Sequence, residues 1–419
     1  MRGGAEFFIA LRYLLGRARE GGRYLKGAAM GIALSLIPIM VTLIVADGMI
    51  RGITDRYLEL GTGHLRIYDY LNAGEVSPEN FREFLNFRGI WRERQGLGIV
   101  MGGKGKAGAT IRAVESGFWT DPGSALFLKT LEGSTELEEP DQVLLGEELA
   151  RSIGAEVGKR VYIMSIRVSP SGQSIPRTLP YTVQGIVSSG YRELDALWCL
   201  MSYEGGGRIL DPELSSDYLT VKIDDPYDKA EETARLIRRA LGPGFAVYSW
   251  KDLQRSQYSS YESTRQLLLF IMALIVVVAA VNVSSATSML VFERQRDIAV
   301  LKAAGAGPAS TTRIFLCAGF LTGLAGAIPG ALLGLLIGFF INPLIRGLEH
   351  VLSFFSGLFR GGEVKILDPG YYLEKIPVII HWKTVFLILL FTVLCSVLAS
   401  WAPSRRAGKI KPIELLRKF

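Results

Sequence analysis

The residues of this chain that could carry catalytic or metal chemistry are few and widely separated. The 419 residues include three histidines, His64, His350 and His381, and none belongs to a His-Glu-x-x-His or Cys/His ligand pattern. Zinc hydrolysis and structural zinc sites both depend on such clusters. We therefore expect each histidine to be a strand or interface residue and not a ligand, and we expect no catalytic residue, metal or cofactor on this chain.

Two stretches with Gly-Lys pairs look like fragments of a phosphate-binding loop. They lie in GGKGKAGAT (102–110) and GAEVGKR (154–160). Neither has the Gly-x-x-x-x-Gly-Lys-Ser/Thr spacing whose backbone amides hold nucleotide phosphates. Both are predicted to be loops or strand connections, so any ATP and magnesium that this system uses are expected on another chain.

The three cysteines do not indicate a disulfide framework. Cys317 and Cys395 lie inside apolar stretches, and only Cys199 belongs to a more polar part of the chain. An odd count with two members in apolar stretches is typical of small buried residues and not of crosslinks.

Four apolar stretches are long enough to cross a bilayer, which takes about 20 residues. They are 27–50, 267–291, 314–341 and 384–402. The chain is 49% hydrophobic but also 21% charged, a combination typical of membrane spans joined to a folded domain in water. None of the stretches has a central Lys, Arg or Glu, so an ion or proton relay is not predicted.

The short flanks of the spans predict the orientation of the chain. Residues 1–26 and 403–419 are both rich in Lys and Arg, and such flanks stay on the cytoplasmic side. We expect a multi-pass protein of the cytoplasmic (inner) membrane with both termini in the cytoplasm. The connection 292–313 is then cytoplasmic, whereas 51–266 and the loop 342–383 lie on the far side.

The stretch 51–266 is expected to form a large α+β domain between the first two spans. Alternating apolar residues predict strands, and two longer periodic stretches predict helices. The predicted strands are 64–70, 160–166, 181–187 and 217–223, and the predicted helices are 147–154 and 228–242. From Asp252 no helix breaker precedes the second span, so one long helix is expected there, either as a simple anchor or as a carrier of motion.

The stretch SPSGQSIPRTLP (169–180) separates two of these predicted strands. It contains three prolines, and proline cannot donate a hydrogen bond to a strand ladder. We therefore expect an extended, projecting loop and not a centrally paired strand.

Small and polar residues mark the helix contacts within the membrane. Four glycines in the third span are each four residues apart, so they share one helix face and allow close helix approach. They are Gly326, Gly330, Gly334 and Gly338. Both packing within one bundle and a seam between two copies fit this pattern. In the second span Asn282, Ser284 and Ser285 are polar enough to hydrogen-bond across helices.

A charged, helix-compatible stretch, FERQRDIAVLKAAGAG (292–307), separates the second and third spans. Ile298, Ala299 and Leu301 form a small apolar face among charged residues, and Gly305 ends the pattern. The pattern fits an interfacial amphipathic helix, and it equally fits a helix that docks into a groove of a cytoplasmic partner.

Several motifs, in their order along the chain, resemble those of LolC/LolE-type permeases, the membrane subunits of the lipoprotein-releasing ABC transporter. In the membrane part the similar segments are FFIALRYLLGRAREGG (7–22), VFERQRDIAVLKAAGAGPASTTRIFLCAGFLTGLAGAIPGALLG (291–334), DPGYYLEKIPVIIHW (368–382) and APSRRAGKIKPIELLRK (402–418). In the external domain they are QVLLGEELARSIGAEVGKRVYIMS (142–165) and TVQGIVSSGYRELDALWCLMS (182–202). The wider MacB/FtsX superfamily shares the loop and the tail.

The resemblance implies an amphipathic N-terminal helix within 1–26 and a coupling helix at 293–305 that binds an ABC ATPase dimer. It assigns coupling to Glu293, Arg296, Ile298, Ala299, Leu301, Lys302 and Gly305. It further implies that lipoprotein cargo enters from the outer leaflet between paired permeases, either two copies or two homologues. The implied cargo face is Val45, Met49, Ile53, Tyr258 and Leu268. A periplasmic carrier and membrane lipids are further expected partners, and no nucleic acid is.

Two features depart from the family pattern. The stretch 169–180 stands where a carrier-docking hook projects in LolC-like subunits, and it is short here. The residues of this stretch that would dock the carrier are Pro170, Arg177 and Pro180. Asp47 stands where the family commonly has Asn, and a pairing with nearby Arg51 is the simpler expectation.

The sequence is also compatible with two other functions. A MacB-like permease would drive efflux of soluble cargo, although MacB-like chains carry their own ATPase domain. An FtsX-like protein would transmit a signal to a cell-wall hydrolase, although its first external domain is usually much smaller. In all three cases this chain is a non-catalytic membrane subunit.

Overall fold

The computed structural model of the chain describes residues 3–15, 22–70, 87–169, 171–358, 373 and 375–410. The chain divides into two compact units. The membrane unit comprises Met1–Met49, Tyr261–His350 and Ile376–Phe419, and the external unit comprises Ile50–Ser260 and Val351–Lys375.

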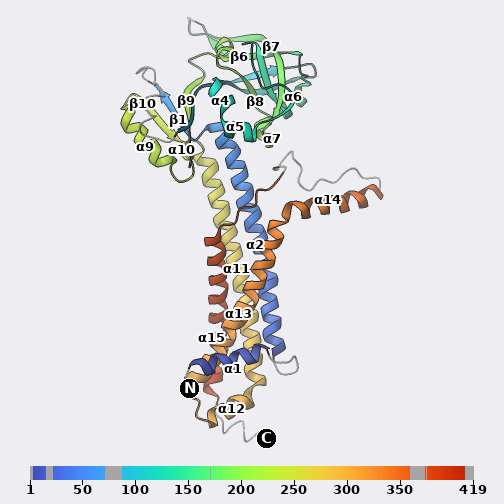
Figure 1. Ribbon diagram of the computed structural model, residues 1–419, viewed down its shortest axis with the longest axis vertical. Coiled ribbons are helices and arrows are strands. Elements are labelled where there is room, and N and C mark those ends of the chain that lie inside the picture. Colours follow the sequence, from blue (N-terminus) through green and yellow to red (C-terminus); the bar gives the residue numbers. More distant parts are fainter. Residues whose placement is uncertain are drawn as a thin grey trace. The chain divides into compact units, whose positions relative to one another are not determined.

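Long helices dominate the membrane unit (Figure 1). Among the described residues, four are long and apolar enough to cross a membrane. They are α2 (Gly22–Arg56), α11 (Arg255–Glu293), α13 (Pro308–Phe339) and α15 (Trp382–Lys409). Two shorter helices accompany them, α1 (Gly3–Leu15) and α12 (Gln295–Ala303), and a third, α14 (Ile341–Leu358), belongs to this unit as far as His350. The long helix expected before the second span is therefore present, whereas the expected loop 342–383 contains the helix α14.

Helix α13 packs closely on α2 because its glycines let the two backbones approach. A Cβ on Gly330 would lie 2.7 Å from Ala33 Cα, and one on Gly334 would lie 2.6 Å from Met40 Cβ. Gly326 and Gly338 meet α2 in the same way. Of the two arrangements that the sequence leaves open, the structure has packing within one bundle.

The described strands of the external unit form one ten-stranded sheet in the order β10-β1-β9-β2-β3-β8-β5-β7-β4, with β6 pairing with β2 and β7. Its strands are β1 (Leu65–Asp69), β2 (Phe87–Met101), β3 (Lys106–Val114), β4 (Lys129–Gly133), β5 (Gln142–Gly146), β6 (Arg160–Val168), β7 (Ser174–Ser188), β8 (Trp198–Ser202), β9 (Ser216–Ile223) and β10 (Phe245–Ser249). Because β6 bridges β2 and β7, the six strands β2, β3, β8, β5, β7 and β6 close into a barrel.

Among the described residues, three apolar clusters stabilise this unit, and the third of them is formed around Leu60 and Trp91. The first fills the barrel and includes Ile111, Val183 and Cys199, all fully buried. The second lies between the strands β1, β9 and β10 and the amphipathic helix α9 (Ala230–Leu241). Short helices connect the strands, namely η1 (Tyr57–Thr62), which is π-helical, α4 (Ser116–Thr120), α5 (Pro122–Phe127), α6 (Glu147–Ile153), α7 (Arg192–Asp195), α8 (Tyr203–Ile209) and α10 (Trp250–Leu253). The α+β class predicted for this domain is confirmed.

The prediction of a projecting loop at 169–180 is wrong from Ser174 onward, whereas the expectation that this stretch is not centrally paired is confirmed. Strand β7 begins at Ser174 and pairs residue by residue with β6, so that Pro176 lies opposite Ile166 and Pro180 opposite Tyr162. Among the described strands, this first half of β7 has no partner on its other edge. The prolines are four residues apart and thus direct their nitrogens to the same, unpaired edge, where no N–H is needed.

Candidate functional site

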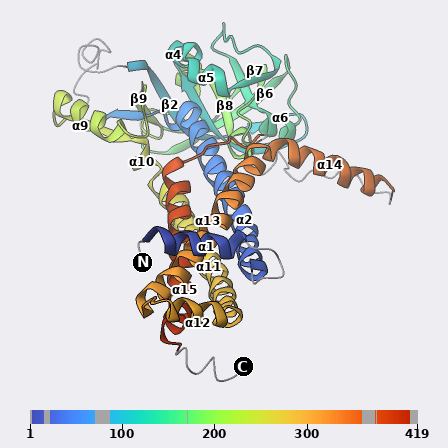
Figure 2. The same cartoon turned by 60° about the horizontal axis from the view of Figure 1, so that its bottom comes forward.

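Helix α12 forms the turn between the second and third spans. The helix before it stops at Glu293, where Arg294 leaves helical geometry with φ −94° and ψ 22°. After α12, Gly305 adopts φ +94°, a value that glycine tolerates best. Pro308 then occupies the first turn of α13. Figure 1 shows α12 and α1 at the same end of the bundle, and Figure 2 brings this end toward the viewer.

The apolar face of α12 packs against the protein's own membrane unit. Ile298 is 0% exposed and Ala299 is 6% exposed, and Ile298 belongs to a buried cluster with Leu290, Ile314 and others. Leu301 is partly buried against the same cluster. The interpretation of Ile298 as a partner-contacting residue is therefore wrong, because its side chain completes the fold of the bundle.

Lys302 also has an internal role. Its Nζ donates to the carbonyl of Gly408 at 2.7 Å and to that of Ile410 at 2.6 Å. These carbonyls lie at the C-terminal end of α15, where a helix has unpaired acceptors and partial negative charge. Lys302 thus joins α12 to the last helix, which a partner-facing side chain would not do.

The outward face of this turn consists of different residues. Val300 is 67% exposed and Phe292 is 66% exposed. Glu293, Arg296 and Gly305, three of the predicted coupling residues, are exposed as well. Because Arg296 and Val300 are one helical turn apart, they share a face that the bundle does not cover.

Helix α1 supports the turn from the side. Tyr13 stacks on Phe315 of α13 with ring centroids 6.0 Å apart, and the guanidinium of Arg294 lies 5.2 Å from the Tyr13 ring. The buried carboxylate of Glu6 accepts a hydrogen bond from Ser310 Oγ at 2.6 Å. Movement of the turn would therefore act on α1 as well as on the spans.

A buried ion pair joins the C-terminal half of α2 to the N-terminal part of α11. Asp47 Oδ1 lies 3.1 Å from Arg265 Nε, and the Asp47 side chain is only 5% exposed. His381 Nε2 lies 3.8 Å from the second carboxylate oxygen. The expected pairing of Asp47 with Arg51 is wrong, because Arg51 pairs with Asp55 at 3.2 Å. A charge buried at this depth is retained only with a partner, and Arg265 is that partner.

The segment before α15 is fastened beside this ion pair. Asn342 donates to the carbonyl of Ile376 at 2.9 Å and accepts from its N–H at 3.0 Å. The Pro377 carbonyl passes so close to Gly48 that a Cβ there would overlap it. These contacts hold the residues that precede α15 against α2 in the membrane unit.

Exchanging the two charges of this ion pair should separate the contribution of the pairing to stability from the contribution of side-chain size. Asp47→Leu is expected to destabilise the protein by about 2 kcal/mol, because it leaves Arg265 without its carboxylate partner. The loss is moderate because the Arg265 side chain is only partly buried. Asp47→Arg should destabilise more, and Asp47→Arg with Arg265→Asp should recover most of the loss. Thermal melting of the purified full-length protein measures this, and a double variant no better than Asp47→Arg would contradict the pairing.

The predicted cargo residues of the membrane unit are partly buried. Val45 and Met49 lie on α2 with intermediate exposure. Leu268 of α11 packs against the cluster of Leu43 and Met272. All three keep some accessible surface, so the cargo role remains a prediction for them.

The other two predicted cargo residues belong to the external unit. Ile53 packs against a cluster that includes Leu60 and Trp91. Tyr258 is 39% exposed, and its ring meets that of Trp250 edge to face at 5.4 Å. Both residues therefore also stabilise the fold of this unit.

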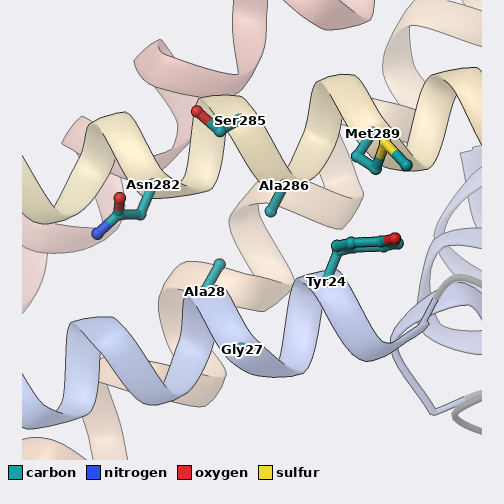
Figure 3. Close-up of a pocket in the computed structure, with 7 residues that line it drawn as sticks. All are labelled: Tyr24, Gly27, Ala28, Asn282, Ser285, Ala286 and Met289. Carbon is teal, nitrogen blue, oxygen red and sulfur yellow. The ribbon is translucent and has the colours of Figure 1, made fainter.

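A hollow of about 340 Å³ opens between α2 and α11. Its walls are Tyr24, Gly27, Ala28, Asn282, Ser285, Ala286 and Met289. Figure 3 shows Ala28 and Ala286 facing one another across the gap, so small side chains create the space. Within the described part of the chain, Asn282, Ser284 and Ser285 show no side-chain hydrogen bond to a neighbouring helix, contrary to expectation.

A buried charge cluster in the external unit holds η1 against the sheet. Lys222 is 0% exposed, and its Nζ lies 2.5 Å from Glu59 Oε2 and 3.2 Å from Asp121 Oδ2. Arg88 contacts both carboxylates from the surface side. Burial lowers the pKa of Lys222, although the two carboxylates oppose this. Burial alone would raise the pKa of Asp121, but Lys222 and the Ser124 N–H lower it.

His64 is part of the same cluster and lies directly before β1, which fits the strand position expected for it. Its Nδ1 accepts from the Ile223 N–H at 2.9 Å, which leaves Nε2 to donate to Glu59 at 3.3 Å. Burial lowers the pKa of His64 despite the contact with Glu59. In the described ranges no group of three His, Cys, Asp or Glu side chains is arranged to hold a metal ion.

Comparison with known proteins identifies the family. Residues 27–239 match the family described as MacB-like periplasmic core domain, and residues 269–412 match FtsX-like permease C-terminal. The lipoprotein-releasing system transmembrane protein LolC of Neisseria meningitidis is 30% identical over 98% of this chain and 99% of its own. The chain belongs to the LolC/LolE family.

Other relatives have the same full-length match. LolC of Xylella fastidiosa is 27% identical, and LolE of Haemophilus influenzae is 23% identical, each over 98% of both chains. The extracellular domain of the ABC-type transporter YknZ covers 44% of this chain at 12% identity with a TM-score of 0.28, too weak a likeness to add to the assignment. The resemblance to LolC/LolE-type permeases within the MacB/FtsX superfamily is thus confirmed, as is the multi-pass membrane architecture.

In this LolC/LolE-family chain, the β6–β7 hairpin replaces the expected loop. One face of the hairpin presents exposed apolar side chains, including Tyr162 at 52% and Ile166 at 53% exposure. Pro180 is exposed and Arg177 is partly exposed, whereas Pro170 lies outside the described residues. Sequence reasoning missed the apolar face because it treated this stretch as unpaired.

Proposed function

We propose that this chain is the permease subunit of an ABC transporter that extracts lipoproteins from the outer leaflet of the inner membrane. The observation that supports it best is the match to LolC and LolE proteins over 98% of the chain. The printed name of those relatives is lipoprotein-releasing system transmembrane protein. Both termini and α12 would then lie in the cytoplasm, as the basic flanks indicate.

The energy source would be an ATPase dimer that binds α12. Two exposed apolar side chains, Val300 and Phe292, lie beside the exposed Arg296 and Glu293. An apolar contact with a polar rim is typical of a docking surface. The internal contacts of Ile298 and Lys302 would transmit the movement of the docked helix to the bundle and to α15. This chain itself would hydrolyse nothing, because the sequence has no phosphate-binding motif.

Cargo would meet the membrane unit near Val45 and Met49, in a complex of two copies or of two homologous permeases. Both side chains lie on the same half of α2 as the ion pair of Asp47 with Arg265. That ion pair would hold the two helices together within one subunit, so that a lipid path opens between subunits. The exposed apolar face of the β6–β7 hairpin would receive the periplasmic carrier.

Site-specific photocrosslinking tests the cargo proposal. A photoreactive side chain at Met49 should crosslink a lipidated protein but not the same protein without its acyl chains. A probe at Leu34, which is 62% exposed on the other half of α2, is the matched control and should crosslink neither form efficiently. Equal crosslinking of lipidated and unlipidated cargo at Met49 would contradict the proposal.

A further inference from the structure

Helix α14 follows the third span directly and is a separate helix. The third span ends at Phe339, Phe340 adopts φ −91° and ψ 18°, and α14 runs from Ile341 to Leu358. Its 18 residues correspond to roughly 27 Å of helix. The helix contains Arg346, Glu349 and His350 and is not among those apolar enough to span a membrane.

The span count gives the side of the membrane on which α14 begins. The chain reaches the external domain after one crossing and α14 after three. Both therefore lie on the same side of the membrane. Since one residue separates α14 from the end of a span, its first turn must lie at the membrane surface, within reach of lipid.

The side chains of α14 are sorted onto two faces. Leu344, Leu348, Val351 and Leu352 follow the i, i+4, i+7, i+8 spacing of a single face. Their exposed fractions are 49%, 52%, 51% and 38%, so the described residues of the protein leave this face largely uncovered. Arg346 and His350 fall on the opposite side, and Glu349 lies at the flank of the apolar face.

We propose that α14 lies in the plane of the membrane with its leucine face among the acyl chains of the outer leaflet. An apolar face opposite a charged one is the pattern of interfacial helices. The attachment of α14 to the end of a span holds that face at the lipid boundary. One basic and one acidic residue nearly cancel, so the insertion needs no anionic lipid and rests on burial of the apolar side chains. The role of this insertion rests on the proposed function: the helix would loosen lipid packing where lipidated cargo leaves the leaflet.

Spin-label accessibility in lipid nanodiscs tests the insertion itself. Single cysteines are placed along 344–353 in the full-length chain with Cys317 and Cys395 replaced by alanine. Cys199 remains, because it is fully buried and burial raises the pKa of its thiol to about 12. Labels at 344, 348 and 352 should collide with oxygen and be protected from a water-soluble nickel chelate, and labels at 346, 350 and 353 should show the reverse.

Two other outcomes would overturn the insertion. Equal nickel access around the helix would mean that α14 lies in water. Low access to both reagents at 344, 348 and 352, with immobilised labels, would mean that protein, such as a second copy, covers the face. Neither of these two outcomes depends on whether the protein releases lipoproteins.

The role in extraction is tested separately in vesicles of neutral lipid that contain the permease and its ATPase. Leu348→Glu with Leu352→Glu should lower release of lipidated cargo about tenfold while ATPase binding is retained. His350→Glu adds charge on the polar face and should leave release unchanged. Normal release by the double variant, with insertion lost, would overturn the role in extraction and leave the proposed function intact.

Discussion

Replacing Val300 with aspartate is expected to weaken binding of the partner ATPase about 30-fold or more. Val300 is 67% exposed on α12, so the substitution should not disturb the membrane unit. A charge placed within an apolar contact costs on the order of 2 kcal/mol or more when that contact is central to an interface. Co-purification and ATPase assays with the full complex measure the effect.

Ile298→Asp is the informative comparison for this first prediction. It should unfold or destabilise the bundle, because a carboxylate would replace a side chain that is 0% exposed. Val300→Ala should bind the ATPase nearly as well as the original protein. A Val300→Asp protein that retains full ATPase binding would show that α12 does not dock through this face.

Replacing Lys222 with methionine is expected to destabilise the external unit by about 3–5 kcal/mol. Lys222 is 0% exposed and neutralises Glu59 and Asp121, while Arg88 reaches the same carboxylates only from the surface side. Without Lys222 two buried carboxylates would lack their main counter-charge. The change in unfolding free energy of the full-length chain can be followed by fluorescence, since Lys222 Nζ lies 5.6 Å from the Trp91 ring.

Two variants control this second prediction. Lys222→Met combined with Glu59→Gln and Asp121→Asn should recover much of the stability, because no unpaired charge remains. Lys251→Met removes a more exposed lysine, 3.7 Å from Glu231, and should cost about 1 kcal/mol or less. Similar losses for Lys222→Met and Lys251→Met would contradict a central role for the buried cluster.

Much of the fold could be predicted from sequence because its strongest signals are local. Four apolar stretches predict the spans, and alternating residues predict β1, β6, β7 and β9. The stretch 169–180 misled because proline content predicts a loop, whereas a strand with one unpaired edge tolerates proline. Closure of the barrel depends on the β2–β6 pairing, which connects residues far apart in the chain and has no local signal.

The candidate site was predicted less completely, for a physical reason. The sequence locates the turn at α12 but cannot tell whether its apolar residues face a partner or their own bundle. The bundle requires Ile298, so Val300 is left on the outward face. The ion pair of Asp47 with Arg265 joins helices that are separated by the whole external domain, so proximity in sequence favoured Arg51 instead.

The most direct test of the account is ATP-driven transfer of lipidated cargo to a soluble carrier. Vesicles would contain this chain, a partner ATPase and a lipoprotein. We expect that cargo moves to the carrier only with ATP, that cargo lacking its acyl chains is not transferred, and that Val300→Asp abolishes transfer. ATP hydrolysis without transfer of cargo, or transfer that Val300→Asp leaves unchanged, would contradict it.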